Sequence, residues 1–356
     1  MDYSSIEKLL KYAGDDEEIK QLAGSILDNA DKAARIVDTT LNKRAADTTH
    51  LKVINAESEK ELVSAINPES VGIVLSGGGA KGAYQIGVWK ALKEKNAFNI
   101  AAVSGSSVGA LNGALMAALE ENEAETIWTS LKEEDFLTDI PDDSKIQFSR
   151  DGLTKIINDS KVYSRIDNSK MLCVVTCFNA STGFPEHHLI NNYSDNDIVD
   201  ALLASSAIPI IYDSQTFKDA KYYDGGFPLL GSNTPISPLY SLGIRKFVVI
   251  HLRTFNTFKN KKTEIMLNRK ILGESFYEGA DFVHIFPSEG LGDLMTGTLN
   301  FDADYLKNTL ELGYKDGIKI ADQVKLMALD SPVETERHYA NGKYFRSYEE
   351  MISLNI

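Results

Sequence analysis

The sequence of 356 residues has only two cysteines, and none of its apolar runs approaches 18 residues. Cys173 and Cys177 fall in an apolar stretch typical of a strand, at residues 172–178. Residues four apart in a strand are separated by roughly 13 Å, too far for a disulfide bond. A transmembrane helix needs about 20 apolar residues, and the N-terminus lacks the basic and apolar regions of a secretory signal. We therefore expect free buried thiols in a soluble, cytoplasmic protein.

Positive charge is also scarce, since 37 lysines and arginines face 51 aspartates and glutamates and leave a net charge of −14. This balance argues against a nucleic-acid partner and against permanent adhesion to anionic membranes through a basic surface. The sequence has no internal repeat, and 43% of its residues are hydrophobic, enough for a sizeable core. We expect one domain of about 280 residues with an appendage.

The motif GSSVG at residues 105–109 follows the apolar run 100–103 and precedes a run of small residues at 110–119. This order predicts a strand, a sharp turn and a helix, with Ser107 at the tip of the turn. Glycines on both sides permit a strained backbone and close packing of the helix on its strand, which leaves the serine hydroxyl at the helix N-terminus. Ser107 is therefore a candidate nucleophile, beside a helix dipole that favours developing negative charge.

A second motif, SGGGAKG at residues 76–82, follows the buried-strand pattern of residues 71–75 and precedes a helical pattern. Three consecutive glycines leave backbone N–H groups unshielded by side chains. Such groups suit an oxyanion hole, where preorganised donors meet the charge that forms on a carbonyl oxygen. Gly77, Gly78 and Gly79 are therefore candidate oxyanion donors.

The same loop satisfies G-x-G-x-x-G, the phosphate-binding pattern of dinucleotide folds. That fold needs an acidic residue about 20 positions further on to hold the ribose, and residues 96–103 contain none. The next strand leads instead into the turn at Ser107. A P-loop is also absent, because glycine-lysine is never followed by serine or threonine. Nucleotide binding is the weaker interpretation of this loop.

The third motif is DGG at residues 224–226. In this order, the glycine loop, the Ser107 motif and Asp224 resemble the patatin-like phospholipase family. The sequence ASSAIP at residues 204–209 also resembles the family's segment before the aspartate. The resemblance extends over residues 71–323 and leaves the N-terminal 70 residues unexplained.

The resemblance implies a lipid acyl hydrolase, of the phospholipase A or lysophospholipase type, that uses a Ser-Asp dyad without a catalytic histidine. Ser107 would be the nucleophile that carries the acyl-enzyme, Asp224 the base, and residues 77–79 the oxyanion hole. Lys81 stands where the family usually has a basic residue. It either orients the loop or a lipid phosphate, or is a solvated loop lysine. No metal or organic cofactor is implied.

Chain order also argues against an ordinary serine hydrolase triad, in which the histidine follows the acid. After Asp224 come His251, His284 and His338, and the first two lie inside apolar strand-like runs. Such histidines are more often satisfied core residues than catalytic bases. Because a carboxylate is a weak base at its ordinary pKa near 4, Asp224 requires a desolvating site that raises its pKa.

Strand and helix patterns alternate along the chain, which together with the resemblance predicts a patatin-like α/β/α sandwich around a mostly parallel sheet. We expect a catalytic domain at residues 69–330 and a C-terminal segment at 331–356. Residues 119–172, which are polar and irregular, are a candidate cap over the cleft. The basic run at 259–262 is expected to be a solvated loop, with contact to phosphate headgroups as the alternative.

Residues 1–68 are expected to form an N-terminal helical extension. Apolar residues at helical spacing between 19 and 41 follow the acidic residues 15–18, a pattern that predicts an amphipathic helix with negative charge in its first turn. We expect this helix to pack on the catalytic domain. A partner, a dimer interface or a regulatory ligand would bury the same apolar stripe.

Two classes of function remain open: a lipid acyl hydrolase, and a non-catalytic lipid- or nucleotide-binding regulatory protein on the same fold. The expected partner is a lipid or another acyl ester, with transient contact to a membrane or micelle. The headgroup, the acyl position and the oligomeric state do not follow from the sequence.

Overall fold

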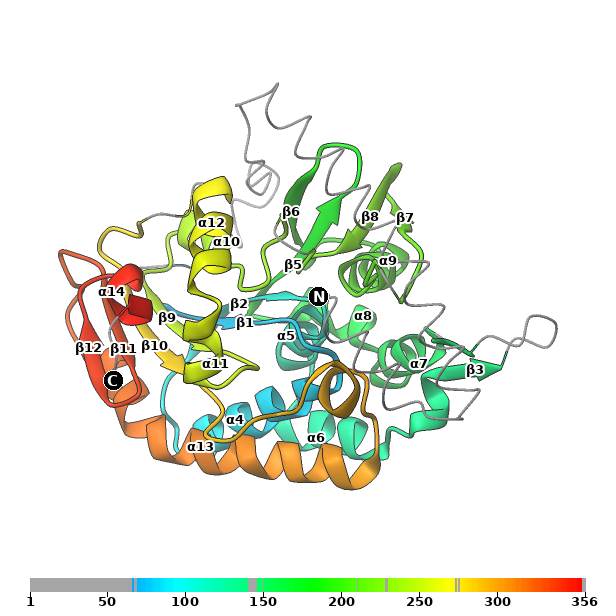
Figure 1. The fold of residues 1–356 in the computed structure, drawn as a ribbon, viewed down its shortest axis with the longest axis horizontal. Coiled ribbons are helices and arrows are strands. Elements are labelled where there is room, and N and C mark those ends of the chain that lie inside the picture. Colours follow the sequence, from blue (N-terminus) through cyan, green and yellow to red (C-terminus); the bar gives the residue numbers. More distant parts are fainter. Residues whose placement is uncertain are drawn as a thin grey trace.

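The computed structural model describes residues 66, 69–139, 146–148, 150–209, 211–227, 230–272, 274 and 276–353. Within these ranges a 10-stranded sheet has the order β12-β11-β10-β9-β1-β2-β5-β8-β7, with β6 also paired to β5 (Figure 1). Its strands are β1 Val71–Leu75, β2 Ile100–Ser106, β5 Leu172–Asn179, β6 Phe184–Leu189, β7 Gln215–Phe217, β8 Ala220–Asp224, β9 Lys246–Ile250, β10 Asp281–Ile285, β11 Arg337–Ala340 and β12 Lys343–Phe345. A separate small sheet pairs β3 Leu137–Asp139 with β4 Ile146–Phe148.

The strands from β11 to β5 run parallel, whereas β12 at one end and β6, β7 and β8 at the other are antiparallel. Strands β1, β9 and β10 are buried along their whole length. Continuous apolar burial is expected at the centre of a parallel sheet with helices on both faces. The predicted mostly parallel α/β architecture is confirmed.

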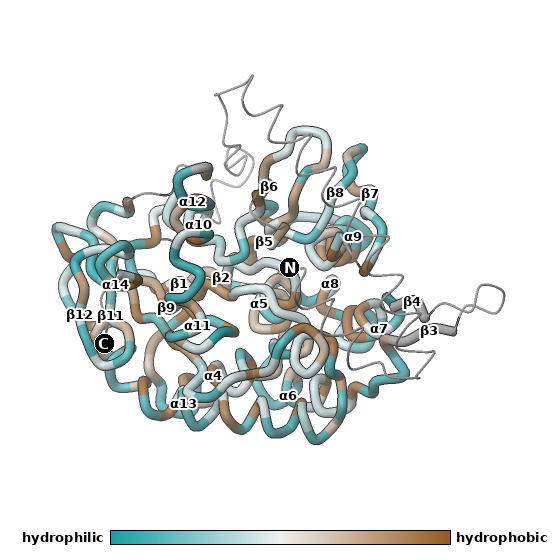
Figure 2. The backbone as a smooth tube through the Cα atoms, viewed as in Figure 1, coloured by the Kyte–Doolittle hydropathy of each residue, from teal (hydrophilic) through white to brown (hydrophobic). Residues whose placement is uncertain are grey.

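Helices cover both faces of the sheet, and successive residues of β1 point into different cores. Ile73 and Leu75 belong to the larger core, together with residues of α4, α5 and α13, whereas Val74 packs with residues of α10 in the smaller core. Figure 2 shows hydrophobic residues concentrated on the central strands and hydrophilic ones on the outer helices. The helices are α4 Ala83–Glu94, α5 Val108–Ala118, α6 Glu121–Ser130, α7 Asp151–Ser160, α8 Val162–Arg165, α9 Asp195–Ser205, α10 Ser237–Ser241, α11 Phe255–Asn260, α12 Lys262–Leu272, α13 Ala303–Leu329 and α14 Tyr348–Ser353.

The expected cap at residues 119–172 differs from the structure. Much of this stretch is helical, as α6, α7 and α8, and Trp128, Ile156 and Ile157 are buried in the larger core. Trp128 also donates a hydrogen bond from Nε1 to Asn112 Oδ1 at 2.9 Å. The buried apolar residues of this segment are short runs among many polar surface residues. The described part of residues 119–172 therefore packs into the larger core.

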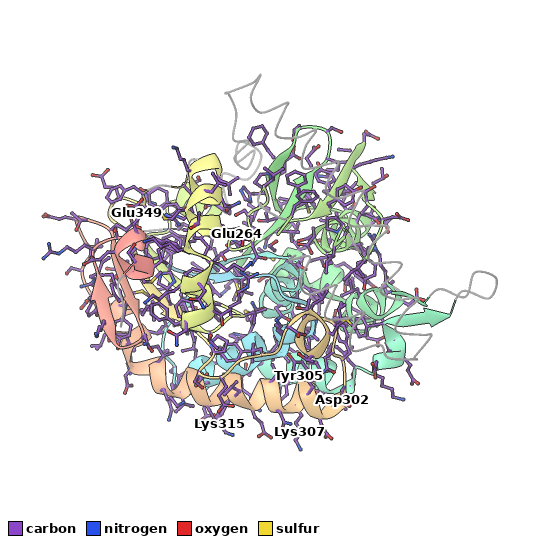
Figure 3. The ribbon with its side chains drawn as sticks, viewed as in Figure 1. Glu264, Asp302, Tyr305, Lys307, Lys315 and Glu349 are labelled. Atoms are coloured by element: carbon purple, nitrogen blue, oxygen red, sulfur yellow. The ribbon has the colours of Figure 1, made fainter. Side chains whose placement is uncertain are left out.

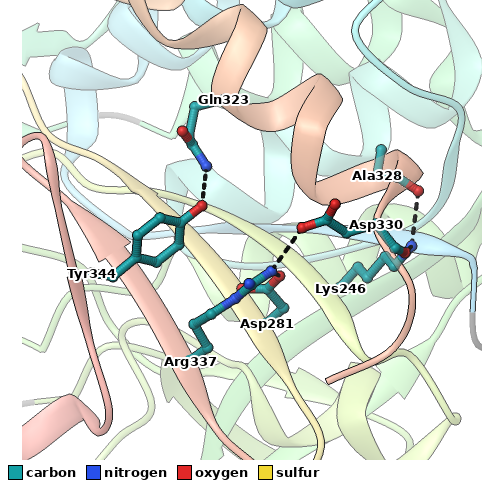
Figure 4. A network of polar contacts seen from close by, with 7 residues as sticks. All are labelled: Lys246, Asp281, Gln323, Ala328, Asp330, Arg337 and Tyr344. Atoms are coloured by element: carbon teal, nitrogen blue, oxygen red, sulfur yellow. Dashed lines mark hydrogen bonds and ion pairs between the residues drawn. The ribbon is translucent and has the colours of Figure 1, made fainter. Parts of the chain in front are cut away.

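The C-terminal strands are joined to the rest of the sheet by a polar network (Figure 4). Arg337 on β11 pairs with Asp281 on β10 and, at 3.1 Å, with Asp330 after α13. Lys246 on β9 donates to the carbonyl oxygens of Ala328 and Asp330 at 2.8 and 2.7 Å. These carbonyls lie at the end of α13, where a cation is favoured. Strands β11 and β12 thus continue the main sheet.

The N-terminal helix expected between residues 19 and 41 lies outside the described residues, as does nearly all of 1–68. The division into 1–68, 69–330 and 331–356 stays a prediction. Among the helices in the described ranges, none is long and apolar enough to cross a membrane.

The crossing of α4 and α13 depends on glycines. A Cβ atom at Gly313 would lie 2.1 Å from Tyr84 O, and one at Gly87 would lie 2.0 Å from Leu310 O. Both atoms that would be struck belong to the backbone of the facing helix, so neither can move without separating the helices.

We therefore expect Gly313→Ala to lower the free energy of unfolding by about 1–3 kcal/mol, as overpacking of a core does. Gly290→Ala is the matched control, because a Cβ atom there meets nothing within 4 Å. Chemical denaturation of both variants measures the difference. Equal stability of the two variants would contradict the packing argument.

Candidate active site

Ser107 lies at the turn between β2 and α5 with φ 56° and ψ −129°. A positive φ is costly for a residue with a side chain and persists only where the surroundings impose it. Here the neighbouring backbones impose it: a Cβ atom at Gly105 would lie 2.1 Å from Gly109 O, and one at Gly109 would lie 2.4 Å from Leu75 O. Both glycines of the motif are thus required by close backbone contacts around Ser107.

Ser205, the last residue of α9, holds this turn from the other side. The Ser107 amide donates to Ser205 Oγ at 2.9 Å, and Ser205 Oγ donates to Thr176 O on β5 at 2.6 Å. Its own carbonyl accepts a hydrogen bond from the Gly225 amide at 3.2 Å. One buried side chain therefore connects the turn at Ser107, the central strand β5 and the turn after Asp224. Ser205 belongs to the ASSAIP segment, whose sequence alone predicts no role for this serine.

Asp224 ends β8 and pairs in register with Cys177 of β5. Its Oδ1 accepts a hydrogen bond from the Gly226 amide at 2.7 Å, and its buried Oδ2 makes no regular hydrogen bond within the described ranges. Burial raises the pKa of Asp224 to about 6, and interactions with the Ser107 hydroxyl and the Gly226 amide offset part of this rise. The serine hydroxyl and the carboxylate therefore lie close together, from elements 117 positions apart in sequence.

The glycine loop lies directly beside this pair. A Cβ atom at Gly77 would be 3.0 Å from Ser107 Cβ. The Gly77 amide donates to Asn233 O at 3.2 Å, whereas the Gly78 and Gly79 amides have no partner in the described part of the chain. They begin the short 3₁₀ helix η2 Gly79–Gly82, and the first amides of a helix lack partners within it.

Lys81 is bound rather than solvated. Its Nζ donates to Gly292 O at 2.8 Å, next to the π-helical turn η5 Leu294–Thr298. Burial and the nearby Arg253 lower the pKa of Lys81 to about 8, and Asp293 opposes this effect. The glycine loop and the η5 segment also approach each other at Gly79, where φ is +59° and a Cβ atom would lie 2.1 Å from Thr298 O. This contact ties the glycine loop to the segment before α13, as an orienting role for Lys81 requires.

Asn233 is a second residue that the sequence analysis missed. Its Oδ1 would lie 2.7 Å from a Cβ atom at Gly77 and 2.5 Å from one at Gly226. The amide side chain therefore sits between the glycine loop and the turn after Asp224. No periodic pattern marks Asn233, because it belongs to neither a strand nor a helix.

The histidines after Asp224 are engaged with one another. His251 Nε2 lies 3.0 Å from His284 Nδ1, and His284 Nε2 lies 2.9 Å from His338 Nδ1. His338 Nε2 in turn contacts Glu336 Oε1 at 2.5 Å. Burial lowers the pKa of all three rings, so they are neutral core residues across β9, β10 and β11, as predicted for His251 and His284.

Other groups with chemical potential fall elsewhere. Cys173 and Cys177 are free and buried, as predicted, and burial raises the pKa of both thiols. Within the described ranges no cluster of histidine, cysteine, aspartate and glutamate is arranged to hold a metal ion.

A family model described as patatin-like phospholipase matches residues 73–240. A stretch of 48 residues is 56% identical to the lysophospholipase nte1 of Aspergillus terreus (strain NIH 2624 / FGSC A1156), and covers 14% of this chain and 3% of that protein. The crystal structure of VipD from Legionella pneumophila is similar at 14% identity and a TM-score of 0.43, over 72% of this chain and 67% of that one.

The matched range contains all three motifs: the glycine loop, the turn at Ser107 and the DGG sequence at Asp224. Residues 73–240 therefore form a patatin-like domain, as the motifs predict.

Proposed function

We propose that this protein hydrolyses fatty-acyl esters of lipids, as a phospholipase A or lysophospholipase, through a dyad of Ser107 and Asp224. The observation that carries the proposal is the position of the strained Ser107 beside a buried carboxylate whose pKa is raised to about 6. The patatin-like domain and the lysophospholipase named among the relatives support a lipid ester as substrate.

In this mechanism Asp224 accepts the proton of the Ser107 hydroxyl while Ser107 Oγ attacks the ester carbonyl carbon. The tetrahedral intermediate then collapses, and the alcohol or lysolipid leaves with that proton. A water molecule next gives a proton to Asp224 and attacks the acyl-enzyme, which releases the fatty acid and restores Ser107. A carboxylate with a raised pKa is a better base than an ordinary aspartate and is still ionised near neutral pH.

The developing negative charge on the carbonyl oxygen requires donors that are not already used. Because the Gly77 amide is bound to Asn233 O, the amides of Gly78 and Gly79 are the donors we propose from the predicted set of residues 77–79. They are fixed before the substrate arrives, and such preorganised donors act strongly in a site that excludes water. Lys81 then acts as a positioning residue through its bond to Gly292 O.

Ser107→Ala and Asp224→Asn should each lower kcat at least about a thousandfold, and the double variant should be no worse than the weaker single, because the two groups act as one unit. Hydrolysis of a lysophospholipid and of a soluble ester measures this. A fluorophosphonate probe should label the native protein and not Ser107→Ala. Failure to label the native protein would favour the non-catalytic binding function instead.

The pH dependence follows from the pKa of Asp224, which is about 6 in the folded protein. The base is the ionised form, so kcat/KM should rise with pH up to about 6 and level off above it. An unperturbed aspartate would place the acid limb near pH 4. A base among the three buried histidines after Asp224, whose pKa values are lowered, would also place it below pH 6. A profile limited by a group with a pKa near 4 would contradict the proposed environment of Asp224.

The same shift has a cost in stability. Because the folded state favours protonated Asp224, the protonated carboxyl contributes to the free energy of unfolding. This contribution is fully present below about pH 4 and is lost as the pH rises through about 6. Asp224→Asn should therefore raise the free energy of unfolding at pH 8 by up to about 3 kcal/mol, while activity disappears. At pH 4 the variant and the native protein should be nearly equal, which thermal melts at both pH values can test.

Ser205→Ala should lower kcat about tenfold to a hundredfold with little change in KM, because the Ser107 amide loses its acceptor and the nucleophile shifts. Ser206→Ala is the matched control, since Ser206 Oγ is equally buried but only donates to Leu202 O within its own helix. The acid limb of the pH profile should stay in place for both variants. Equal losses of kcat would assign Ser205 a general structural role.

A further inference from the structure

A pocket of about 630 Å³ lies away from Ser107, along α12 and against α14. Figure 1 shows these two helices side by side near the C-terminal edge of the sheet, and Figure 3 labels Glu264 on α12 and Glu349 on α14. The pocket is lined by Lys262, Thr263, Met266, Leu267, Arg269 and Lys270 from α12 and by Glu349 from α14. Cationic and apolar groups therefore share one wall.

Arg269 is the unusual member of this wall. Its side chain is only 7% exposed, and its Nη2 is buried with no hydrogen-bond partner among the described residues. The guanidinium lies over the ring of Tyr348 at 4.0 Å and near that of Tyr277 at 5.5 Å. Arginine is rarely buried without an acceptor, so the guanidinium needs an acceptor that the described residues do not supply.

Two buried acids interact electrostatically with Arg269, Glu274 and Glu336, and neither fills this gap. Glu336 is engaged by His338 and by the Tyr277 amide. Arg269 counteracts the effect of burial, which raises the pKa of Glu274, but the two side chains form no ion pair within the described part of the chain. Glu274 instead interacts with Ser237 and Tyr277. The attraction acts through space and leaves Arg269 Nη2 without an acceptor.

The surrounding charge favours an anion. In a chain with a net charge of −14, residues 255–272 carry Lys259, Lys261, Lys262, Arg269 and Lys270 against Glu264 alone. Glu264 pairs with Lys261 at 3.0 Å, while Lys262 and Lys270 are exposed at the pocket. In place of the expected loop at 259–262, α11 ends at Asn260, Lys261 forms a turn and Lys262 begins α12. Lys262, Arg269 and Lys270 of α12 all line the pocket.

Apolar surface adjoins these cations. Leu267 is 49% exposed on the pocket wall, and Phe276, shortly after α12, is 55% exposed. Large apolar side chains beside lysines are typical of surfaces that meet anionic lipids. On α12, Asn268 donates to Gly231 O at 2.8 Å, which fixes the helix to the segment that follows Asp224.

We propose that the pocket formed by α12 and α14 binds a phosphate group, with the guanidinium of Arg269 as its floor, Lys262 and Lys270 as its rim, and an anionic phospholipid as its source. Arg269 gives the phosphate a planar, charge-assisted donor. Leu267, on the pocket wall, contacts the apolar part of the lipid. The site is separate from Ser107 and does not depend on hydrolysis.

The test uses full-length protein carrying Ser107→Ala, so that binding is measured whether or not the native protein is a hydrolase. Cosedimentation with phosphatidylcholine vesicles is compared with and without phosphatidic acid. Arg269→Gln, and separately Lys262→Gln with Lys270→Gln, should each weaken binding to the acidic vesicles about tenfold. Thermal melts should show that the variants fold, and the double variant changes only exposed side chains.

Lys307→Gln with Lys315→Gln is the matched control, because it removes the same charge from exposed positions on α13 (Figure 3). This control should bind acidic vesicles like the parent protein. Equal weakening by the control, or undiminished binding by both pocket variants, would overturn the proposal. So would equal binding to vesicles without phosphatidic acid.

A second arm distinguishes the source of the phosphate. Glycerol 3-phosphate is titrated into the same proteins by calorimetry. Binding that Arg269→Gln removes, with no preference for acidic vesicles, would retain the phosphate site but overturn its assignment to lipid. Absence of binding to both glycerol 3-phosphate and acidic vesicles would overturn the site itself.

Discussion

The candidate site depends on one strained residue, since Ser107 has a backbone conformation that an isolated chain avoids. Three contacts hold it: α5 packs against the backbone of β1 at Gly109, the chain folds back on itself at Gly105, and Ser205 accepts the Ser107 amide. None of these contacts is local to a single element. The conformation of Ser107 therefore depends on the assembled sheet. Strands β1, β2 and β5 must all pair in register before this turn can form.

The motif residues of the site could be predicted because they are conformational necessities. Gly105 and Gly109 have backbone atoms within 2.5 Å of where a side chain would begin, so the sequence must show glycine there. Strands β1, β9 and β10 could also be predicted from their apolar runs, since both faces of a central parallel strand are buried. The burial of His251 and His284 could be predicted for the same reason, although His251 lies just after β9 rather than within it.

Other features depend on the third dimension and leave no periodic signal. Ser205 and Asn233 act through a single polar atom each, brought to the turn at Ser107 by elements far away in sequence. The prediction of a cap at residues 119–172 was wrong because the exposed residues there are rich in acidic groups. The buried residues between them, such as Trp128, belong to the larger core. The sequence predicts residues 77–79 together as oxyanion donors. The proposed choice of Gly78 and Gly79 depends on the hydrogen bond from the Gly77 amide to Asn233 O, which only the structure shows.

Several costs are concentrated near the Ser107–Asp224 pair and along α12. The positive φ of Ser107, and the buried Oδ2 of Asp224 and Nη2 of Arg269 without a partner among the described residues, each disfavour the folded state. Trp89, Glu121 and His188 also bury an unpartnered polar atom within the described ranges, whereas the histidine chain that ends at Glu336 and the Lys246 bonds to the end of α13 are satisfied. A fold retains unfavourable groups where a ligand or a reaction uses them. The adjoining Ser107 distinguishes Asp224, and the pocket that it lines distinguishes Arg269. These surroundings are the physical reason to propose proton transfer for Asp224 and an anion for Arg269, and to leave the equally buried histidines as structure.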